Sequence, residues 1–132
     1  TGIYTILAEG DDANEPIVDA ARAILDGHVL LSRELAAMGQ YPAIDINFSV
    51  SRLASRLITS EQRALVRKFR RLMATWEENR DLVSVGAYRA GTNPELDDVL
   101  QRRGALQAFL QQDVDERVEY EGGFAQLSEV LS

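Results

Sequence analysis

The residue best suited to chemistry is Arg52, which directly follows the apolar run "AIDINFSV" and Ser51. No Gly or Asn turn separates this run from Arg52, so a permanently charged guanidinium stands at the end of a predicted buried strand. A guanidinium is planar and fits the geometry of phosphate and carboxylate groups. From the residues alone, pairing with a neighbouring acid is the ordinary role of such an arginine.

Other groups that carry out catalysis are scarce. Lys68 is the only lysine and follows Arg67 inside a predicted helix, so the phosphate-binding pattern G-x-x-x-x-G-K-[ST] is missing. Cysteine is absent, and the single histidine, His28, lies in a strand-like apolar run. Asp11 and Asp12 sit in "EGDDANEP", where a turn that caps a helix is the favoured interpretation over a cation site. We therefore expect no metal site.

The 132 residues allow one domain, or a small domain with a piece of another. The sequence has no apolar run of twenty residues and no leader, which favours a cytoplasmic protein. A strand-like run, "IYTILA", begins almost at once and suggests that the chain was cut from something longer.

The net charge of −7 is unevenly distributed, because residues 51–80 hold eight bases and three acids between two acidic flanks. The basic stretch "RALVRKFRR" carries apolar residues at helical spacing, which favours an amphipathic helix with an arginine-rich outer face. Phosphate contacts dominate nucleic-acid affinity, and an acidic chain repels phosphate. We expect no nucleic-acid partner.

The predicted secondary structure changes near residue 55, from alternating strands and helices to helices alone. Before it, the runs "IYTILA", "HVLLS" and "AIDI" predict strands, and "EPIVDAARAIL" and "RELAAMG" predict helical segments between them. After it, Thr59 and Gln62 form a capping box for a helix over 60–79, and "NRDLVSVGAY" predicts a short helical piece. Asn93 and Pro94 begin another helix, and "GGFAQLSEVLS" ends the chain with a last one.

The runs "LDGHVLLSREL", "YPAIDI" and "SVSR", together with "NRDLVSVGAY", closely resemble the C-terminal third of the flagellar protein-export ATPases. That family is related to the type III secretion ATPases and to the subunits of rotary ATP synthases. The resemblance covers nearly the whole chain, and "NRDLVSVGAY" favours the flagellar branch over the injectisome branch.

The resemblance implies the fold class, which is an α/β remnant of a RecA-like P-loop NTPase domain followed by a mainly α-helical C-terminal domain. Residues 1–55 would be the end of the RecA-like domain, and residues 56–132 the helical domain. The parent would be a homo-hexameric ATP hydrolase that binds ATP with Mg²⁺ and energises flagellar or type III protein export. Its P-loop would lie upstream of Thr1, so the chain alone is expected to bind no cofactor and to be inactive.

The resemblance also implies roles for individual residues. Arg52 matches an arginine finger that acts in trans on the γ-phosphate held by the neighbouring subunit. Tyr120, in "ERVEYEGG" after "FLQQ", corresponds to an aromatic residue that contacts adenine, although packing in the helical core would equally explain it. Leu7 stands where related catalytic subunits have an adenine-stacking tyrosine. Because of this departure, the resemblance assigns no aromatic contact to the other side of the adenine pocket.

Partners are implied as well. The segment 86–98 aligns with a loop that touches the central stalk, so Glu95, Asp97 and Asp98 are candidate stalk contacts, although helix capping alone would explain these acids. A coiled-coil stalk protein, a regulator and export chaperone–substrate complexes would dock on the helical domain. The parent would be cytoplasmic and peripheral at the inner face of the cell membrane, beside the export gate. The alternative function is a non-catalytic helical module that docks export partners.

Overall fold

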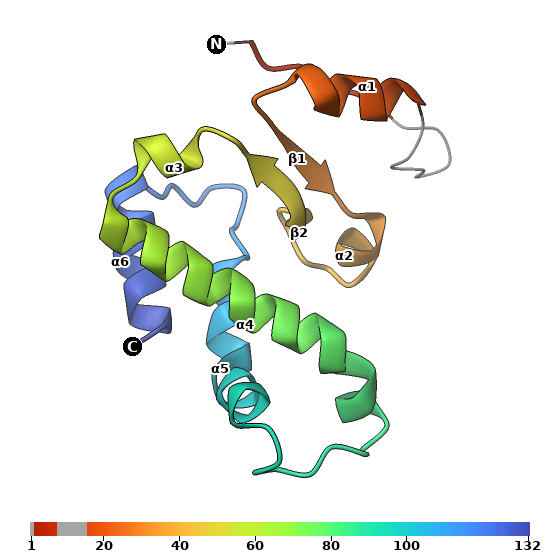
Figure 1. The fold of residues 1–132 in the computed structure, drawn as a ribbon, viewed down its shortest axis with the longest axis vertical. Coiled ribbons are helices and arrows are strands. Elements are labelled where there is room, and N and C mark those ends of the chain that lie inside the picture. The colour runs from red at the N-terminus through yellow and green to blue at the C-terminus, as the bar shows by residue number, and fades with distance from the viewer. Residues whose placement is uncertain (1, 8–15) are drawn as a thin grey trace.

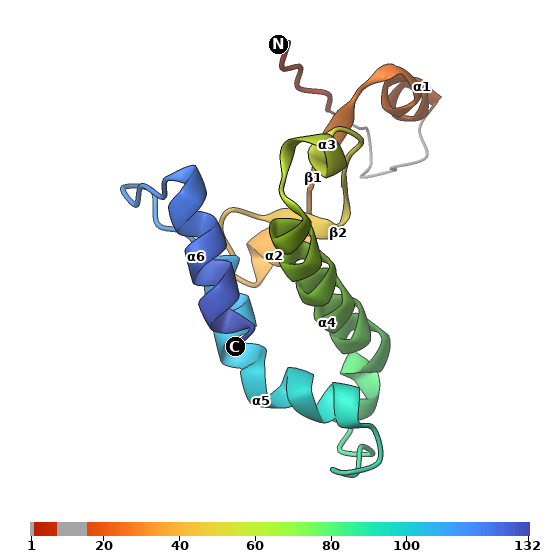
Figure 2. The same ribbon diagram turned by 60° about the vertical axis from the view of Figure 1, so that its left-hand side comes forward.

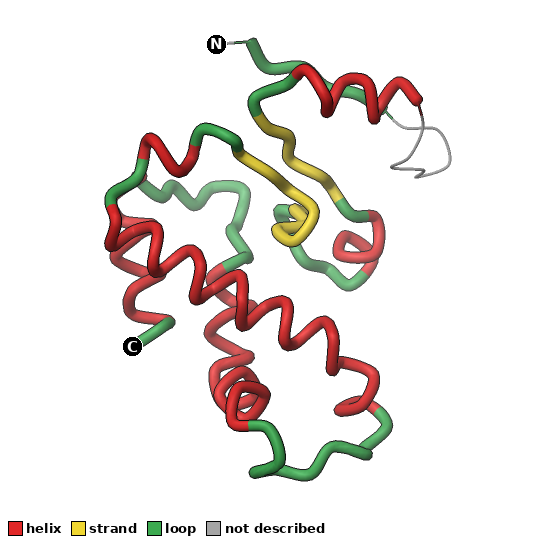
Figure 3. The backbone as a smooth tube through the Cα atoms, viewed as in Figure 1, coloured by secondary structure: helices red, strands yellow, loops and turns green. Residues whose placement is uncertain are grey.

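A computed structural model describes residues 2–7 and 16–132. Two short strands lie beside an assembly of helices, and the second strand contacts the longest helix (Figure 1). The elements are α1 (Pro16–Ile24), β1 (Gly27–Leu31), α2 (Arg33–Ala37), β2 (Ile44–Ser51), α3 (Ala54–Leu57), α4 (Ser60–Ser84), α5 (Pro94–Phe109) and α6 (Tyr120–Val130). Figure 3 shows how little of the described chain is strand.

The two strands form an antiparallel pair with an irregular register. At one end Gly27 faces Ser51, and the pairing is interrupted between His28 and Leu30, where β2 bulges away from β1. A glycine is required at position 27, where β1 begins, because an added Cβ would lie 2.6 Å from the carbonyl oxygen of Val50. The pair ends at Ser51, and the next residue is Arg52.

The predicted alternation of strands and helices is only partly observed. "HVLLS" and "AIDI" lie in β1 and β2, and "EPIVDAARAIL" contains α1. The strand predicted for "IYTILA" is wrong for residues 3–7, which form no regular element. A single strand leaves its backbone groups unpaired, and the described residues supply it no partner. The described sheet therefore has two antiparallel strands, and the RecA-like assignment stays a prediction.

The longest helix, α4, begins at the predicted capping box. The Thr59 hydroxyl accepts from the Gln62 amide at 3.2 Å, and the Gln62 side chain accepts from the Thr59 amide at 2.9 Å. The helix continues to Ser84, so it includes the first part of the segment predicted as a separate helical piece. Nothing in that segment breaks a helix before Gly86, whose φ of 70° favours glycine and ends α4.

A core between α4, α5 and α6 holds the helical part together, and Figure 2 shows these three helices around it. α5 begins as predicted, because the Asn93 side chain accepts from the amides of Glu95 and Leu96 at 3.1 and 3.2 Å. Leu96 is fully buried. The core cluster consists of Phe69, Leu72, Val99, Leu106, Leu127 and Leu131. In the part of the chain that the structure describes, every helix is too short or too polar to cross a membrane.

Candidate functional site

Arg52 leaves β2 and lies against the C-terminal end of α1. Its amide donates to the Asp26 carbonyl at 2.8 Å, and its guanidinium donates to the carbonyl oxygens of Arg22 at 3.1 Å and Ala23 at 3.4 Å. Carbonyl groups in the last turn of a helix lack helical partners and carry partial negative charge. Within residues 2–7 and 16–132, carbonyl oxygens therefore hold Arg52, and no carboxylate does. The guanidinium stays exposed to solvent.

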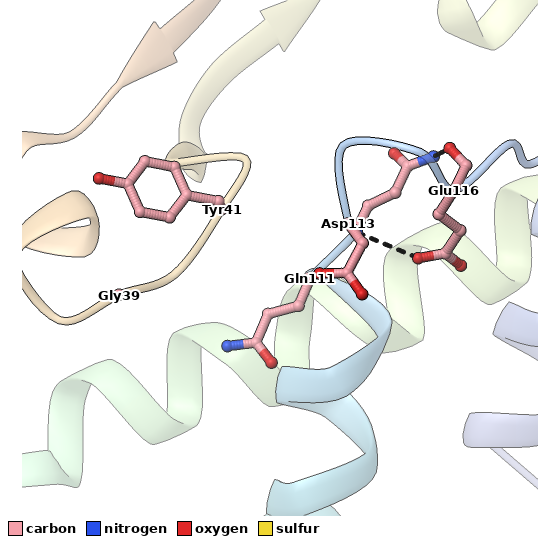
Figure 4. A pocket seen from close by; sticks show the side chains of 6 residues that line it. Gly39, Tyr41, Gln111, Asp113 and Glu116 are labelled. Carbon is pink, nitrogen blue, oxygen red and sulfur yellow. Dashed lines mark hydrogen bonds between the residues drawn. The ribbon is translucent and has the colours of Figure 1, made fainter.

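A cavity of about 330 Å³ opens between the loop that joins α2 to β2 and the segment that follows α5. The two sides meet through the Gln112 amide, which donates to the Tyr41 carbonyl at 2.9 Å. Figure 4 shows Gly39 and Tyr41 on one side and Gln111, Asp113 and Glu116 on the other. The lining residues are Gly39, Tyr41, Gln111, Gln112, Asp113 and Glu116.

The chemistry of this cavity suits a flat, polar ring. Tyr41 is 59% exposed, and its aromatic ring is of a kind that stacks on flat ligands. The side-chain amide of Gln111 offers both donors and an acceptor, and the Asp113 carboxylate offers acceptors. Gln112 and Glu116 brace the wall, because the Gln112 side chain donates to the Glu116 carbonyl at 2.9 Å.

The predicted adenine contacts do not line this cavity. Tyr120 is the first residue of α6, where it is 61% exposed and packs edge-on against Phe124 at a ring-centroid distance of 5.3 Å. Leu7 is 92% exposed in the segment before α1. Sequence reasoning missed Tyr41, although its motif "YPAIDI" was noticed, because the pocket exists only where two distant loops meet.

Asp97, the central acid of the predicted stalk contact, organises the loop in front of α5. Its carboxylate accepts from the Tyr88 hydroxyl at 2.8 Å and from the Gly91 amide at 2.9 Å. Partial burial is the main cause that raises the pKa of the Tyr88 hydroxyl above its ordinary value, and the hydrogen bond to Asp97 is the second cause. The Tyr88 hydroxyl also donates to the Asn93 carbonyl at 3.1 Å. The loop is therefore tied to the start of α5.

The two other acids of that group form ion pairs within the chain. Glu95 pairs with Arg71 of α4, and the hydrogen bond to Glu95 raises the pKa of Arg71. Asp98 pairs with Arg102 one turn later in α5, at 2.6 Å. Both pairs are partly exposed to solvent, which limits their contribution to stability. All three acids are thus engaged by the chain itself.

The described residues contain no group of three His, Cys, Asp or Glu side chains close enough to hold a metal ion. Asp11 and Asp12, which were interpreted as a turn, lie outside the described residues. The ring Nε2 of His28 in β1 donates to the Phe48 carbonyl of β2 at 2.8 Å.

Two family models match the chain. The model described as the T3SS EscN ATPase C-terminal domain matches residues 58–129, which is more than half of the chain. The model described as the nucleotide-binding domain of the ATP synthase alpha/beta family matches residues 1–51.

Curated relatives carry the name flagellum-specific ATP synthase. The protein of that name from Salmonella typhimurium is 54% identical over 121 residues, which cover 92% of this chain and 26% of the relative. The one from Helicobacter pylori strain J99 is 44% identical over 131 residues, which cover 99% of this chain and 30% of the relative. The chain therefore spans between a quarter and a third of the length of these relatives.

Solved structures of EscN resemble the chain throughout. The assembled ATPase EscN from the type III secretion system of enteropathogenic E. coli matches 98% of this chain and 31% of its own, with a TM-score of 0.94 and 39% identity. EscN in complex with its central stalk EscO matches 89% of this chain and 29% of its own, with a TM-score of 0.84 and 37% identity.

Proposed function

The chain belongs to the T3SS EscN ATPase C-terminal domain family, and from this premise we propose that it is the C-terminal part of an ATP hydrolase that energises flagellar protein export. The name shared by the curated relatives supports the flagellar branch. In this proposal residues 1–55 end a RecA-like nucleotide-binding domain and residues 56–132 form the helical domain. The ranges matched by the two family models support that division.

The observation that carries the proposal is the environment of Arg52. A permanently charged fork stands exposed at the end of β2, and it is held by two carbonyl oxygens at 3.1 and 3.4 Å. Neutral acceptors at these distances bind a guanidinium more weakly than phosphate oxygens do. Arg52 can therefore exchange these acceptors for a phosphate presented by a neighbouring subunit.

We assign to Arg52 the role of an arginine finger that acts in trans in a homo-hexamer. The transition state of phosphoryl transfer spreads negative charge over the equatorial oxygens, and a bidentate guanidinium stabilises that charge. Such fingers are worth about 10³ to 10⁵ in rate, which corresponds to about 4 to 7 kcal/mol of the activation barrier. The substrate of the parent is ATP with Mg²⁺, and the described residues supply no cluster of metal ligands, so no step is assigned to the ion.

For the adenine ring we propose the cavity at Tyr41. An exposed aromatic face and a neighbouring carboxamide suit a purine, which stacks and hydrogen-bonds along its edge. The cavity also adjoins "FLQQ", the segment near which an adenine contact was expected. Tyr120 and Leu7 stay predictions as adenine contacts, and both lie outside this cavity.

We further propose that the helical domain docks a coiled-coil stalk protein, a regulator and export chaperone–substrate complexes. EscN, which this chain resembles, has been solved in complex with its central stalk EscO. Glu95, Asp97 and Asp98 remain the candidate stalk contacts. The proposed place of work is the cytoplasmic face of the membrane, beside the export gate.

The test is hydrolysis by the full-length ATPase, meaning the longer chain that carries this segment after a P-loop. The proposal expects ATP turnover that rises with ring assembly and that is lost in Arg52→Ala. The alternative, a non-catalytic helical module, is supported by a core whose buried residues all come from α4, α5, α6 and the residue after α6. Full-length protein that assembles and docks partners but never hydrolyses ATP would support that alternative.

A further inference from the structure

Arg70 of α4 reaches across to the strand that ends beside Arg52. Its Nη2 atom donates to the Ile46 carbonyl at 2.7 Å and to the Ser49 carbonyl at 2.5 Å. Both carbonyl groups lie where β2 bulges away from β1. One guanidinium nitrogen of the helical part therefore bridges two points of β2, which lie six and three residues before Arg52.

The bulge explains why these carbonyl groups take a partner from outside the sheet. A bulge interrupts the ladder of backbone hydrogen bonds and leaves some backbone groups without a partner in the neighbouring strand. The Phe48 carbonyl accepts from the His28 ring, and the Leu30 amide donates to the Ser49 hydroxyl at 3.0 Å. Arg70 supplies the donors for Ile46 and Ser49, so it helps to fix the shape of the bulge.

The position of Arg70 is set by the helical core. Its neighbours in α4, Phe69 and Leu72, are buried against α5 and α6. α4 runs unbroken from Ser60 to Ser84, a length of about 37 Å, and ends at the loop tied down by Asp97 (Figure 1). A displacement of that loop can therefore reach Arg70 through one rigid helix.

Apolar packing between β2 and the helical core involves Ile46. An apolar hollow of about 310 Å³ lies between β2 and α4. Its lining includes Ile46 and Ser49 of β2 and Val66, Phe69 and Arg70 of α4. The walls of this hollow make fewer contacts than a filled interface would. The two hydrogen bonds from Arg70 add directional contacts between α4 and β2 to this packing.

We propose that Arg70 is a positioning residue for Arg52, which couples the orientation of the helical domain to the placement of the arginine finger. This inference rests on the proposed function, because it needs Arg52 to act on a phosphate. Arg70 itself touches no phosphate in this proposal. Its substitution should lower the rate of the chemical step and leave nucleotide binding unchanged.

The experiment compares Arg70→Met, Arg70→Lys and Arg67→Met in the full-length ATPase. Arg67 is the matched control, since it lies one turn earlier in α4, is exposed, and makes no side-chain hydrogen bond or ion pair within the described part of the chain. We expect Arg70→Met to lower kcat about ten- to a hundredfold, the rate equivalent of losing a hydrogen bond to a charged group. KM and the Kd for ATP should stay unchanged, Arg70→Lys should retain part of the rate, and Arg67→Met should match wild type.

A double-mutant cycle then tests whether Arg70 acts through Arg52. Single-turnover rates are measured for Arg52→Ala with and without Arg70→Met, and we expect the second substitution to have no further effect once Arg52 is gone. Equal effects in both backgrounds would overturn the inference, as would a rise in the Kd for ATP that accounts for the whole loss. Circular dichroism and thermal melting identify a misfolded variant, and in that case the Arg70→Lys cycle decides.

The same data separate the two proposals. If Arg52→Ala abolishes hydrolysis and Arg70→Met does not change it, the finger stands and the coupling through Arg70 is wrong. If Arg52→Ala hydrolyses ATP at the wild-type rate, the finger is wrong and the inference falls with it.

Discussion

The Arg52 guanidinium donates to the carbonyl oxygen of Arg22, 3.1 Å away at the end of α1. This contact joins the end of β2 to α1. The same guanidinium is the group that we propose to act on phosphate. Its own chain thus holds the guanidinium by hydrogen bonds of moderate strength, since bonds to neutral carbonyl groups are weaker than bonds to anions.

Replacement of Arg52 by alanine in the full-length ATPase should lower kcat by about 10³ to 10⁵ and leave the Kd for ATP near the wild-type value. Steady-state hydrolysis and fluorescence titration with a nucleotide analogue measure the two quantities. Arg56→Ala is the matched control, because Arg56 is an exposed arginine four residues on with no side-chain hydrogen bond or ion pair to the described residues. Turnover near wild type in Arg52→Ala would remove Arg52 from the mechanism.

Replacement of Tyr41 by alanine should weaken ATP binding by about 5- to 150-fold, since stacking of a base on an aromatic ring is worth about 1 to 3 kcal/mol. Tyr41→Phe keeps the ring and should bind ATP normally. Tyr120→Ala provides the comparison between the two candidate contacts, and the cavity proposal expects it to bind like wild type. Equilibrium titration of the full-length protein distinguishes them, and a defect confined to Tyr120→Ala would place adenine at α6 instead.

The stability of the chain should fall in alkaline solution because of Tyr88. Its pKa is raised in the folded state, so the unfolded state ionises first as the pH rises past the ordinary tyrosine value of about 10. Folded protein then binds more protons than unfolded protein, and the free energy of unfolding decreases with rising pH above that value. Urea unfolding at pH 8 and pH 11 measures the decrease, which should be smaller in Tyr88→Phe. An equal decrease in both proteins would show that Tyr88 does not contribute.

Charge reversal at Glu95 tests its role as a stalk contact. Glu95→Lys loses the ion pair with Arg71, so weaker binding of the stalk protein could arise from the altered domain. The double variant Arg71→Glu with Glu95→Lys restores an ion pair with exchanged charges. If the acid itself contacts the stalk, binding measured by calorimetry should stay weak in the double variant. Recovery of binding would show that Glu95 acts only through Arg71.

The helical part was predictable because its signals are local. The capping box of Thr59 and Gln62 and the cap at Asn93 each lie within four residues, and both begin helices in the structure. The end of α4 was predicted too early, because "NRDLVSVGAY" was interpreted as a separate helical piece although no residue in it opposes helix before Gly86. The true end needs the positive φ at Gly86.

The strand region and the site were harder to predict, since both depend on contacts between distant segments. The run at residues 3–7 has the composition of a strand, but strand structure also requires a partner. The bulge in β2 leaves no trace in the alternation of polar and apolar residues, so the carbonyl groups that bind Arg70 could not be anticipated. The position of Arg52 at the end of β2 was predictable, whereas its carbonyl partners were not.

The tight fit at Gly27 restricts which residues the β1–β2 pair can accept at that position. Because it sits opposite Ser51 with the Val50 carbonyl 2.6 Å from where a methyl group would stand, even alanine would push the second strand outward. Such a shift would also displace Arg52, because its amide donates to the carbonyl of Asp26, the residue before Gly27. A substitution at position 27 would therefore also change where the Arg52 guanidinium lies, although the two residues are 25 positions apart in the sequence.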